Sequence, residues 1–196
     1  MKTIRKGIFE TNSSSIHTLV IAHDNPVIPK GKLYFGLGEF GWGPDVLNNI
    51  EDRASYLWTY IADYLAGAES EFKWNDDGFT DDVNKIAHKY ADKLSSILSK
   101  YDIECEFDFR KNNGLFDGYI DHSADWNTYN YDKENRTYTR NNDSPFKEML
   151  REGNEQMLID YLFSDKSQIA VFNDNDDYDN MITYPTCDYD EYEKGN

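Results

Sequence analysis

Three stretches of the chain carry apolar residues at spacings of three and four, and short alternating stretches lie between them. The helical stretches begin at Pro44, Thr80 and Ser144, and this spacing places the apolar side chains on one face of an α-helix. The strand patterns lie at 16–22, 32–35, 103–109 and 168–172. The two kinds of stretch lack the regular strand–helix–strand alternation of a parallel sheet. The sequence therefore predicts an α+β fold, with a mostly antiparallel sheet packed against about three helices.

The domain organisation follows from length and composition. A chain of 196 residues with 39% hydrophobic and 15% aromatic residues can bury a core without disulfides or metals. We predict a single α+β domain over 1–182. The remaining segment, 183–196, is acidic, and we expect it to form a mobile tail.

Membrane and secretory segments are not expected. No stretch approaches the roughly 20 apolar residues that span a bilayer, and no apolar run follows the basic N-terminus as it would in a secretory signal. The two cysteines, Cys105 and Cys187, lack the spacing of a disulfide framework or a metal site. We therefore expect a cytoplasmic protein that uses no cofactor, no metal and no membrane.

The charge of the chain is strongly unbalanced, because 37 acidic and 20 basic residues give a net charge of −17. Such a protein repels nucleic acid in general and is attracted to basic surfaces. We expect a basic nucleic-acid-binding protein as its partner, since rows of carboxylates can take the place of phosphates. The alternative is that the charge serves solubility alone.

One candidate carboxylate row lies in 103–109, where apolar and polar residues alternate strictly. Its polar face presents Glu104, Glu106 and Asp108, which could mimic phosphates or bind a cation. The alternative is the solvated face of an antiparallel strand. A second acidic run, 173–179, is dense in oxygen ligands but lacks the glycine of a calcium loop. There we favour a solvated turn.

The densest polar segment, 5–17, leads into the strand pattern at 16–22. Ser15 and His17 share a face of that strand, because side chains alternate along it. Hydroxyls beside an imidazole can hold a phosphate or supply an activated nucleophile. The alternative is a Ser/Asn turn whose side chains bond their own backbone. The candidate phosphate-binding residues are Arg5, Asn12, Ser13, Ser14 and Ser15.

A second polar segment, 118–126, supplies Asp121 and His122. Two imidazoles, one acting as a base and the other as an acid, suffice to cleave RNA through its 2′-hydroxyl without a metal. His17 and His122 are therefore the candidate catalytic pair. In this mechanism Glu10 or Asp121 orients one of the two imidazoles.

The other two histidines, His23 and His88, are less useful by position, and His88 is expected at the surface of a helix. No phosphate-loop, dinucleotide-binding, zinc-protease or serine-hydrolase motif occurs in the sequence. Basic patches with interleaved aromatic residues are also absent from it, which argues against ordinary DNA binding.

The pattern Arg-x-Gly-x-Phe-Glu-Thr-Asn-Ser-Ser-Ser-x-His at 5–17 resembles the opening of a set of small proteins carried by phages and mobile elements of Gram-positive bacteria. Segments 118–123 and 173–176 resemble the same set. This chain departs from the set in the Ser-Ala-Asp-Trp that follows His122 and in its long acidic tail. The polar residues shared through the resemblance are Glu10, Asn12, Ser13, Ser14, Ser15, His17, Asp121, His122 and Asp174.

The resemblance implies an accessory role for a mobile element in a bacterial host cell, and some acidic proteins of similar size and origin are anti-CRISPR inhibitors. We therefore favour a counter-defence protein, an anti-CRISPR-like inhibitor of a nucleic-acid-guided nuclease. Its target is a CRISPR effector complex, and cleavage of the guide RNA is one way it could act. The alternatives are a small metal-independent ribonuclease-type hydrolase of another role and a non-catalytic acidic interaction module.

Overall fold

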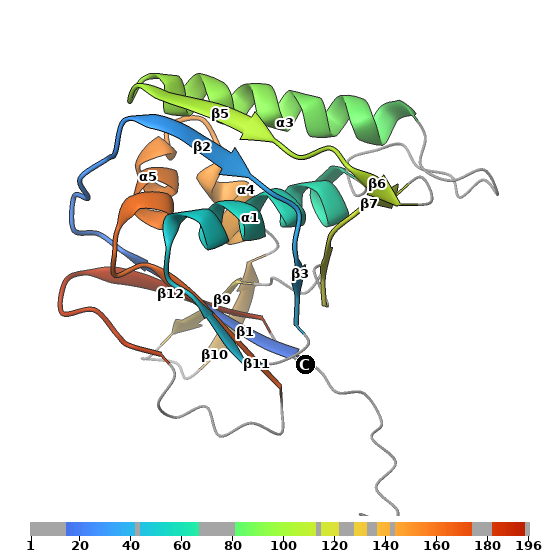
Figure 1. Cartoon of the computed structure of the whole chain (residues 1–196). Coiled ribbons are helices and arrows are strands. Elements are labelled where there is room, and N and C mark those ends of the chain that lie inside the picture. Colours follow the sequence, from blue (N-terminus) through green and yellow to red (C-terminus); the bar gives the residue numbers. More distant parts are fainter. Residues whose placement is uncertain are drawn as a thin grey trace, which may run out of the picture.

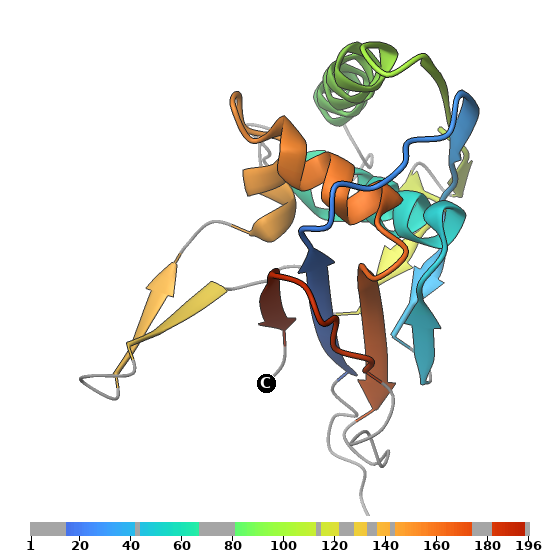
Figure 2. The same ribbon diagram turned by 90° about the vertical axis from the view of Figure 1, so that its left-hand side faces the viewer.

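A four-stranded antiparallel sheet forms the first layer of the computed structural model (Figure 1). The structure describes residues 15–41, 44–66, 81–112, 115–121, 128–132, 137–141, 144–173 and 182–194. The strands of this sheet are β1 (Ser15–Ala22), β4 (Asp45–Leu47), β11 (Gln168–Asn173) and β12 (Tyr189–Lys194). Their order is β12–β1–β11–β4, and Figure 2 shows them side by side. β1 and β11 are the two central strands, and most of their side chains are buried, including the polar Ser15 and His17 of β1.

Helices form the second layer, next to this sheet. They are α1 (Ile50–Tyr60), its π-helical continuation η1 (Ile61–Leu65), α4 (Pro145–Met149) and α5 (Glu155–Phe163). Asn49 caps the N-terminus of α1, and its side chain accepts a hydrogen bond from the backbone N–H of Asp52. Ser144 caps the N-terminus of α4, and Pro145 lies in its first turn, where the missing N–H of proline has no cost.

The third layer consists of α3 (Asp81–Ser99) and the parallel pair β2 (Gly31–Phe35) and β5 (Ile103–Phe107). β2 packs on α1, and α3 packs on β5. The pair is parallel because the chain passes through α1 and α3 between the two strands, which is the usual crossover connection. α1 is thus enclosed between two layers, which explains why most of its residues are buried.

Three small strand pairs complete the fold. β3 (Glu39–Phe40) runs parallel to β8 (Tyr119–Ile120), while β6 (Lys111–Asn112) with β7 (Leu115–Phe116) and β9 (Thr128–Asp132) with β10 (Thr137–Asn141) are antiparallel. The predicted fold class, α+β with a mostly antiparallel sheet against helices, is confirmed.

The elements differ from the sequence prediction in three places. The first helix begins at Ile50 rather than at Pro44, and β4 lies before it. The third helix is interrupted between α4 and α5, where Gly153 has a φ of +92° that a helix cannot contain. The expected tail contains β12, which pairs with β1 and packs the half-buried Tyr192 against the core.

The core is rich in aromatic side chains, and its largest fully buried members include Trp58, Tyr56, Tyr60, Tyr161 and Phe146. Arg53 of α1 is buried with them and donates hydrogen bonds to the carbonyls of Leu162, Ser164 and Ser167. These carbonyls lie at the end of α5 and just beyond it. Carbonyls at the C-terminal end of a helix lack a backbone N–H partner within the helix. The hydrogen bonds from Arg53 therefore connect α1 to the end of α5.

Candidate functional site

A buried polar cluster lies near the start of β1, around His17. The ring of His17 is fully buried, with Nε2 3.0 Å from Oγ of Ser15 and Nδ1 2.6 Å from Oη of Tyr56. Ser15 and His17 share a strand face, as predicted, because they are two positions apart. α1 supplies Tyr56 from the helical layer. We call Ser15, His17, Tyr56, Tyr119 and Asp121 the His17 cluster.

Asp121, the residue after β8, joins this cluster beside Ser15. Its Oδ2 accepts a hydrogen bond from the backbone N–H of Ser15 at 3.4 Å, although the two residues are 106 positions apart. Its Oδ1 accepts a hydrogen bond from Oη of Tyr119 at 2.8 Å. Partial burial and then this hydrogen bond raise the pKa of Tyr119 to about 12. The β3–β8 pair positions Asp121, whose N–H donates to the carbonyl of Phe40 at 2.9 Å.

Gly41 closes the cluster on one side. Its φ of +123° lies in the region that favours glycine. A Cβ at this position would overlap the Cβ of Asp121 and would lie 3.2 Å from Oγ of Ser15. The backbone therefore passes so close to the cluster that only glycine fits without a shift.

The structure brings together three of the predicted site residues, Ser15, His17 and Asp121. The remaining candidates lie outside the described residues: Arg5, Glu10, Asn12, Ser13, Ser14 and His122. The pairing of His17 with His122 therefore stays a prediction. Nδ1 of His17 contacts the hydroxyl of Tyr56, a residue that the sequence did not single out. Tyr56 lies outside the apolar stripe of its helix, so spacing alone did not single it out.

The chemistry of this arrangement follows from the imidazole. In a neutral imidazole one ring nitrogen donates and the other accepts, so the neutral form of His17 can pair with Ser15 at one ring nitrogen and with Tyr56 at the other. With Nε2 as the acceptor, His17 could take the proton of Ser15 and activate it as a nucleophile. Ser15 is only 2% exposed, however, and a nucleophile and its base must reach the substrate. The described geometry thus favours a structural cluster over a reaction centre.

The predicted carboxylate row is interrupted. Glu104 and Glu106 are exposed on β5, and Nζ of Lys32 on β2 lies 3.6 Å and 2.6 Å from them. Asp108, beyond the end of β5, is instead buried and accepts a hydrogen bond from Nε of Arg110 at 2.7 Å. Burial opposes its charge, but the hydrogen bonds from Arg110 outweigh burial and lower the pKa of Asp108. Glu104 and Glu106 therefore lie on a solvated strand face, but β5 pairs with β2 in parallel rather than antiparallel. Asp108 lies beyond the strand and is buried.

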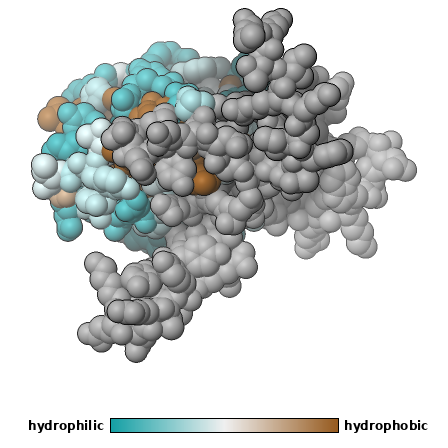
Figure 3. Space-filling model, turned by 90° about the horizontal axis from the view of Figure 1, so that it is seen from below, coloured by the Kyte–Doolittle hydropathy of each residue, from teal (hydrophilic) through white to brown (hydrophobic). Residues whose placement is uncertain are grey.

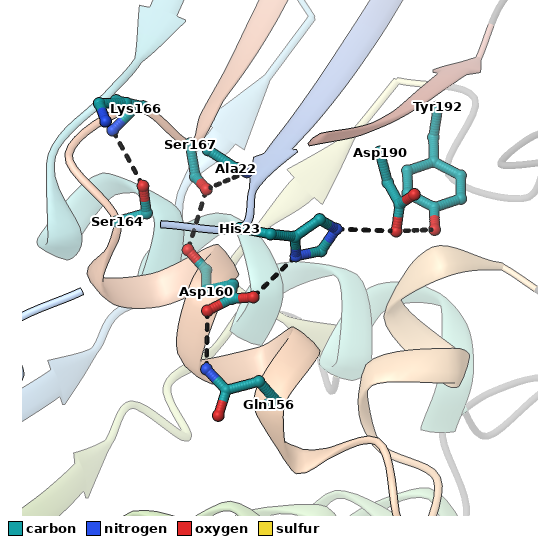
Figure 4. Close-up of polar contacts among 9 residues, drawn as sticks. All are labelled: Ala22, His23, Gln156, Asp160, Ser164, Lys166, Ser167, Asp190 and Tyr192. Atoms are coloured by element: carbon teal, nitrogen blue, oxygen red, sulfur yellow. Dashed lines mark hydrogen bonds and ion pairs between the residues drawn. The ribbon is translucent and has the colours of Figure 1, made fainter. Parts of the chain in front are cut away.

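A second polar cluster lies around His23, a residue that the sequence prediction set aside. Nδ1 of His23 lies 2.7 Å from Oδ2 of Asp160, and Nε2 lies 3.3 Å from Oδ2 of Asp190 (Figure 4). We call these three residues the His23 bridge. They come from three elements that are far apart in the sequence, so no spacing pattern could have identified them.

The described residues contain neither a metal-binding group nor a membrane-spanning helix. In the parts of the chain that the structure describes, no group of three or more His, Cys, Asp or Glu side chains is arranged to hold a metal ion. The acidic run at 174–179 lies outside those parts. Among the helices described here, none has the length and the apolar character needed to cross a membrane.

Comparisons with known proteins give no relative for this chain. No protein-family model matches it, and no curated protein and no solved structure gives a significant match. The resemblance of segment 5–17 to phage and mobile-element proteins therefore stays a prediction.

Proposed function

We propose that this chain acts by binding: it is an acidic, anti-CRISPR-like inhibitor that covers the nucleic-acid-binding surface of a nucleic-acid-guided nuclease. The observation that carries the proposal is an exposed strip along β12 and the segment that leads into it. We call this strip the acidic edge, and its members, all exposed, are Tyr184, Asp188, Tyr189, Asp190 and Glu191.

The acidic edge combines three carboxylates with two phenol rings. The rings of Tyr184 and Tyr189 lie 5.8 Å apart, and Oη of Tyr184 donates a hydrogen bond to Glu191 at 2.8 Å. No lysine or arginine occurs between Tyr184 and Glu191 in the sequence. Carboxylates pair with basic side chains, tyrosine rings stack on guanidinium groups, and aromatic residues are enriched at protein interfaces. This chemistry fits an arginine-rich surface that normally holds nucleic acid.

The rest of the described surface does not offset this charge. Many cations there already have an acidic partner, and the pairs include Lys30–Asp102, Lys32–Glu106, Lys100–Glu155, Arg110–Asp108, Arg151–Glu148 and Lys166–Asp24. The described part of the face in Figure 3 is mainly hydrophilic, with scattered hydrophobic residues. The net charge of −17 therefore favours approach to a basic partner.

Binding to guide-loaded CRISPR nucleases of Gram-positive bacteria tests the proposal. We expect a complex in gel filtration with at least one of them. Its affinity should fall about tenfold or more when salt is raised from about 0.05 to about 0.5 M, because salt screens charges. Failure to form a complex with any member of the panel contradicts the proposal.

Two double variants that each remove two charges locate the contact. Asp188→Asn with Glu191→Gln changes the acidic edge, whereas Glu104→Gln with Glu106→Gln changes carboxylates that Lys32 already neutralises in part. The first pair should weaken the complex by about tenfold and the second by less than about threefold. Equal losses would show that the edge is not the contact.

A second candidate function is a metal-independent ribonuclease-type hydrolase. One observation favours it, the 3.0 Å contact between Oγ of Ser15 and Nε2 of His17. Labelled guide RNA, incubated with the protein in EDTA, distinguishes the two functions. RNA fragments that form with the wild type but not with the His17→Ala variant support the hydrolase. Intact RNA after incubation with the folded wild type excludes it.

A further inference from the structure

His23 lies where β1, α5 and β12 meet (Figure 4). It follows β1 directly, and its backbone N–H extends the ladder by donating to the carbonyl of Asp188 at 2.8 Å. Its side chain is 34% exposed, that of Asp160 is 4% exposed and that of Asp190 is 52% exposed. The imidazole therefore joins a buried carboxylate on a helix to an exposed carboxylate on an edge strand.

The protonation state of the imidazole decides whether both of these contacts are hydrogen bonds. An ionised carboxylate only accepts, and a neutral imidazole has a single N–H to donate. A protonated imidazole donates from both ring nitrogens, so it can hold Asp160 and Asp190 at the same time. In the neutral form, one nitrogen lone pair faces a carboxylate oxygen, and that contact is repulsive.

The Asp160 side of the His23 bridge is fixed by other contacts. Its second carboxylate oxygen accepts a hydrogen bond from Nε2 of Gln156 at 2.8 Å. Its carbonyl accepts one from Oγ of Ser167 at 2.9 Å, and that hydroxyl accepts one from the N–H of Ala22 at 2.9 Å. α5 and the end of β1 are therefore held together whatever the charge of the imidazole. Asp190 belongs to an edge strand, and edge strands open more easily than central ones.

We propose that the His23 bridge is a pH-dependent latch: the protonated imidazole holds the first residues of β12 on the sheet, and loss of the proton releases them. The latch is independent of the proposed function, since it rests on the contacts of three side chains. Because Asp190 is also part of the acidic edge, the latch sets how firmly that edge is held.

Charged and titratable groups surround the imidazole from each neighbouring element. α5 contributes Asp160 and β12 contributes Asp190, whose Oδ2 also accepts a hydrogen bond from Oη of Tyr192 at 3.4 Å. Asp24 follows His23 in the chain and forms an ion pair with Lys166, whose Nζ lies 3.1 Å from Oδ2 of Asp24. That lysine is neutralised by its own partner, so the two carboxylates dominate the field at the ring.

The direction of the switch follows from these contacts. Burial of the ring lowers the pKa of His23, but the hydrogen bond to Asp160 and the charges of Asp190 and Asp160 outweigh burial and raise the pKa above its usual 6.5. A group whose pKa is raised on folding stabilises the folded state fully below its unfolded pKa. The latch is therefore closed at mildly acidic pH and opens as pH rises through the raised pKa.

Titration of the imidazole by NMR tests the first part of the proposal. We expect the Cε1–H of His23 to titrate with a midpoint above 6.5, and the Asp190→Asn variant to lower that midpoint by about half a unit or more. Asp188→Asn is the matched control, because Asp188 contacts His23 through its backbone carbonyl. If both variants move the midpoint equally, the specific contact with Asp190 is refuted.

Hydrogen exchange of the β12 amides tests the release itself. After correction for intrinsic exchange rates, protection of these amides should fall about three- to tenfold between about pH 6 and about pH 8.5, as expected when one or two hydrogen bonds are lost. The β11 amides provide the internal control, and His23→Gln should abolish the pH dependence. Unchanged β12 protection in the wild type, or equal pH dependence in His23→Gln, overturns the latch.

Discussion

His17, near the start of β1, and His23, just after its end, are six positions apart, yet the contacts described for them differ. His17 is fully buried between the neutral hydroxyls of Ser15 and Tyr56. His23 is one-third exposed between two carboxylates, those of Asp160 and Asp190. Hydroxyl partners satisfy a neutral imidazole, whereas carboxylates favour a charged one. The partners described here therefore suit packing at His17 and, in the proposed latch, switching at His23.

The largest expected effect distinguishes the two histidines by stability. His17→Ala should lower the free energy of unfolding by about 3 kcal/mol, because it leaves a cavity and removes the ring that the buried hydroxyls of Ser15 and Tyr56 contact. His23→Ala at about pH 8 should cost less than about 1 kcal/mol, since its contacts are solvent-screened. Urea denaturation followed by circular dichroism measures both values. Similar losses of unfolding free energy for the two variants would contradict the difference proposed between His17 and His23.

A smaller effect is expected at Gly41, next to the His17 cluster. Gly41→Ala should destabilise the protein by about 2–3 kcal/mol, because its Cβ would overlap Asp121 and its φ is positive. Gly31→Ala is the matched control, since Gly31 has a φ of +128° with open space around it. That control should cost about 1 kcal/mol, from backbone strain alone. An equal loss of stability at Gly41 and Gly31 would mean that Asp121 can move aside without loss of stability.

The smallest effect is a pH dependence confined to His23. The difference in unfolding free energy between the wild type and His23→Gln should be present below about pH 6.5 and disappear as pH rises through the raised pKa of His23. Its size should stay below about 1 kcal/mol because the ring is partly exposed. Denaturation midpoints at several pH values measure it. A difference that grows with pH would reverse the sign of the latch.

Local patterns in the sequence predicted the fold class, but they could not predict how the chain ends its elements. Apolar spacing identified the helical stretches, and strict alternation identified β5 within 103–109. The interruption between α4 and α5 depends on the positive φ of Gly153, which spacing does not encode. β12 was expected to be part of a tail because its composition is acidic. In the structure, its half-buried Tyr192 packs on the core.

The same limit applies to the two polar clusters. Alternation along one strand was enough to place Ser15 beside His17. The approach of Asp121 to Ser15 depends on the β3–β8 pair, and the contact of Tyr56 with His17 depends on how α1 packs against the sheet. The His23 bridge requires three elements to meet. Contacts of this kind are set by tertiary packing, so a single sequence does not reveal them.

The central claim is that the chain inhibits a guided nuclease through its acidic surface and not through chemistry at His17. Protection of target DNA by the full chain tests it most directly, using the effector that binds and the wild type, His17→Ala and the Asp188→Asn/Glu191→Gln double variant. Each protein is first shown to be folded by circular dichroism. The account predicts equal protection by the wild type and His17→Ala, reduced protection by the double variant, and intact guide RNA throughout. Loss of protection with folded His17→Ala, together with cleaved guide RNA in the wild type, would contradict it.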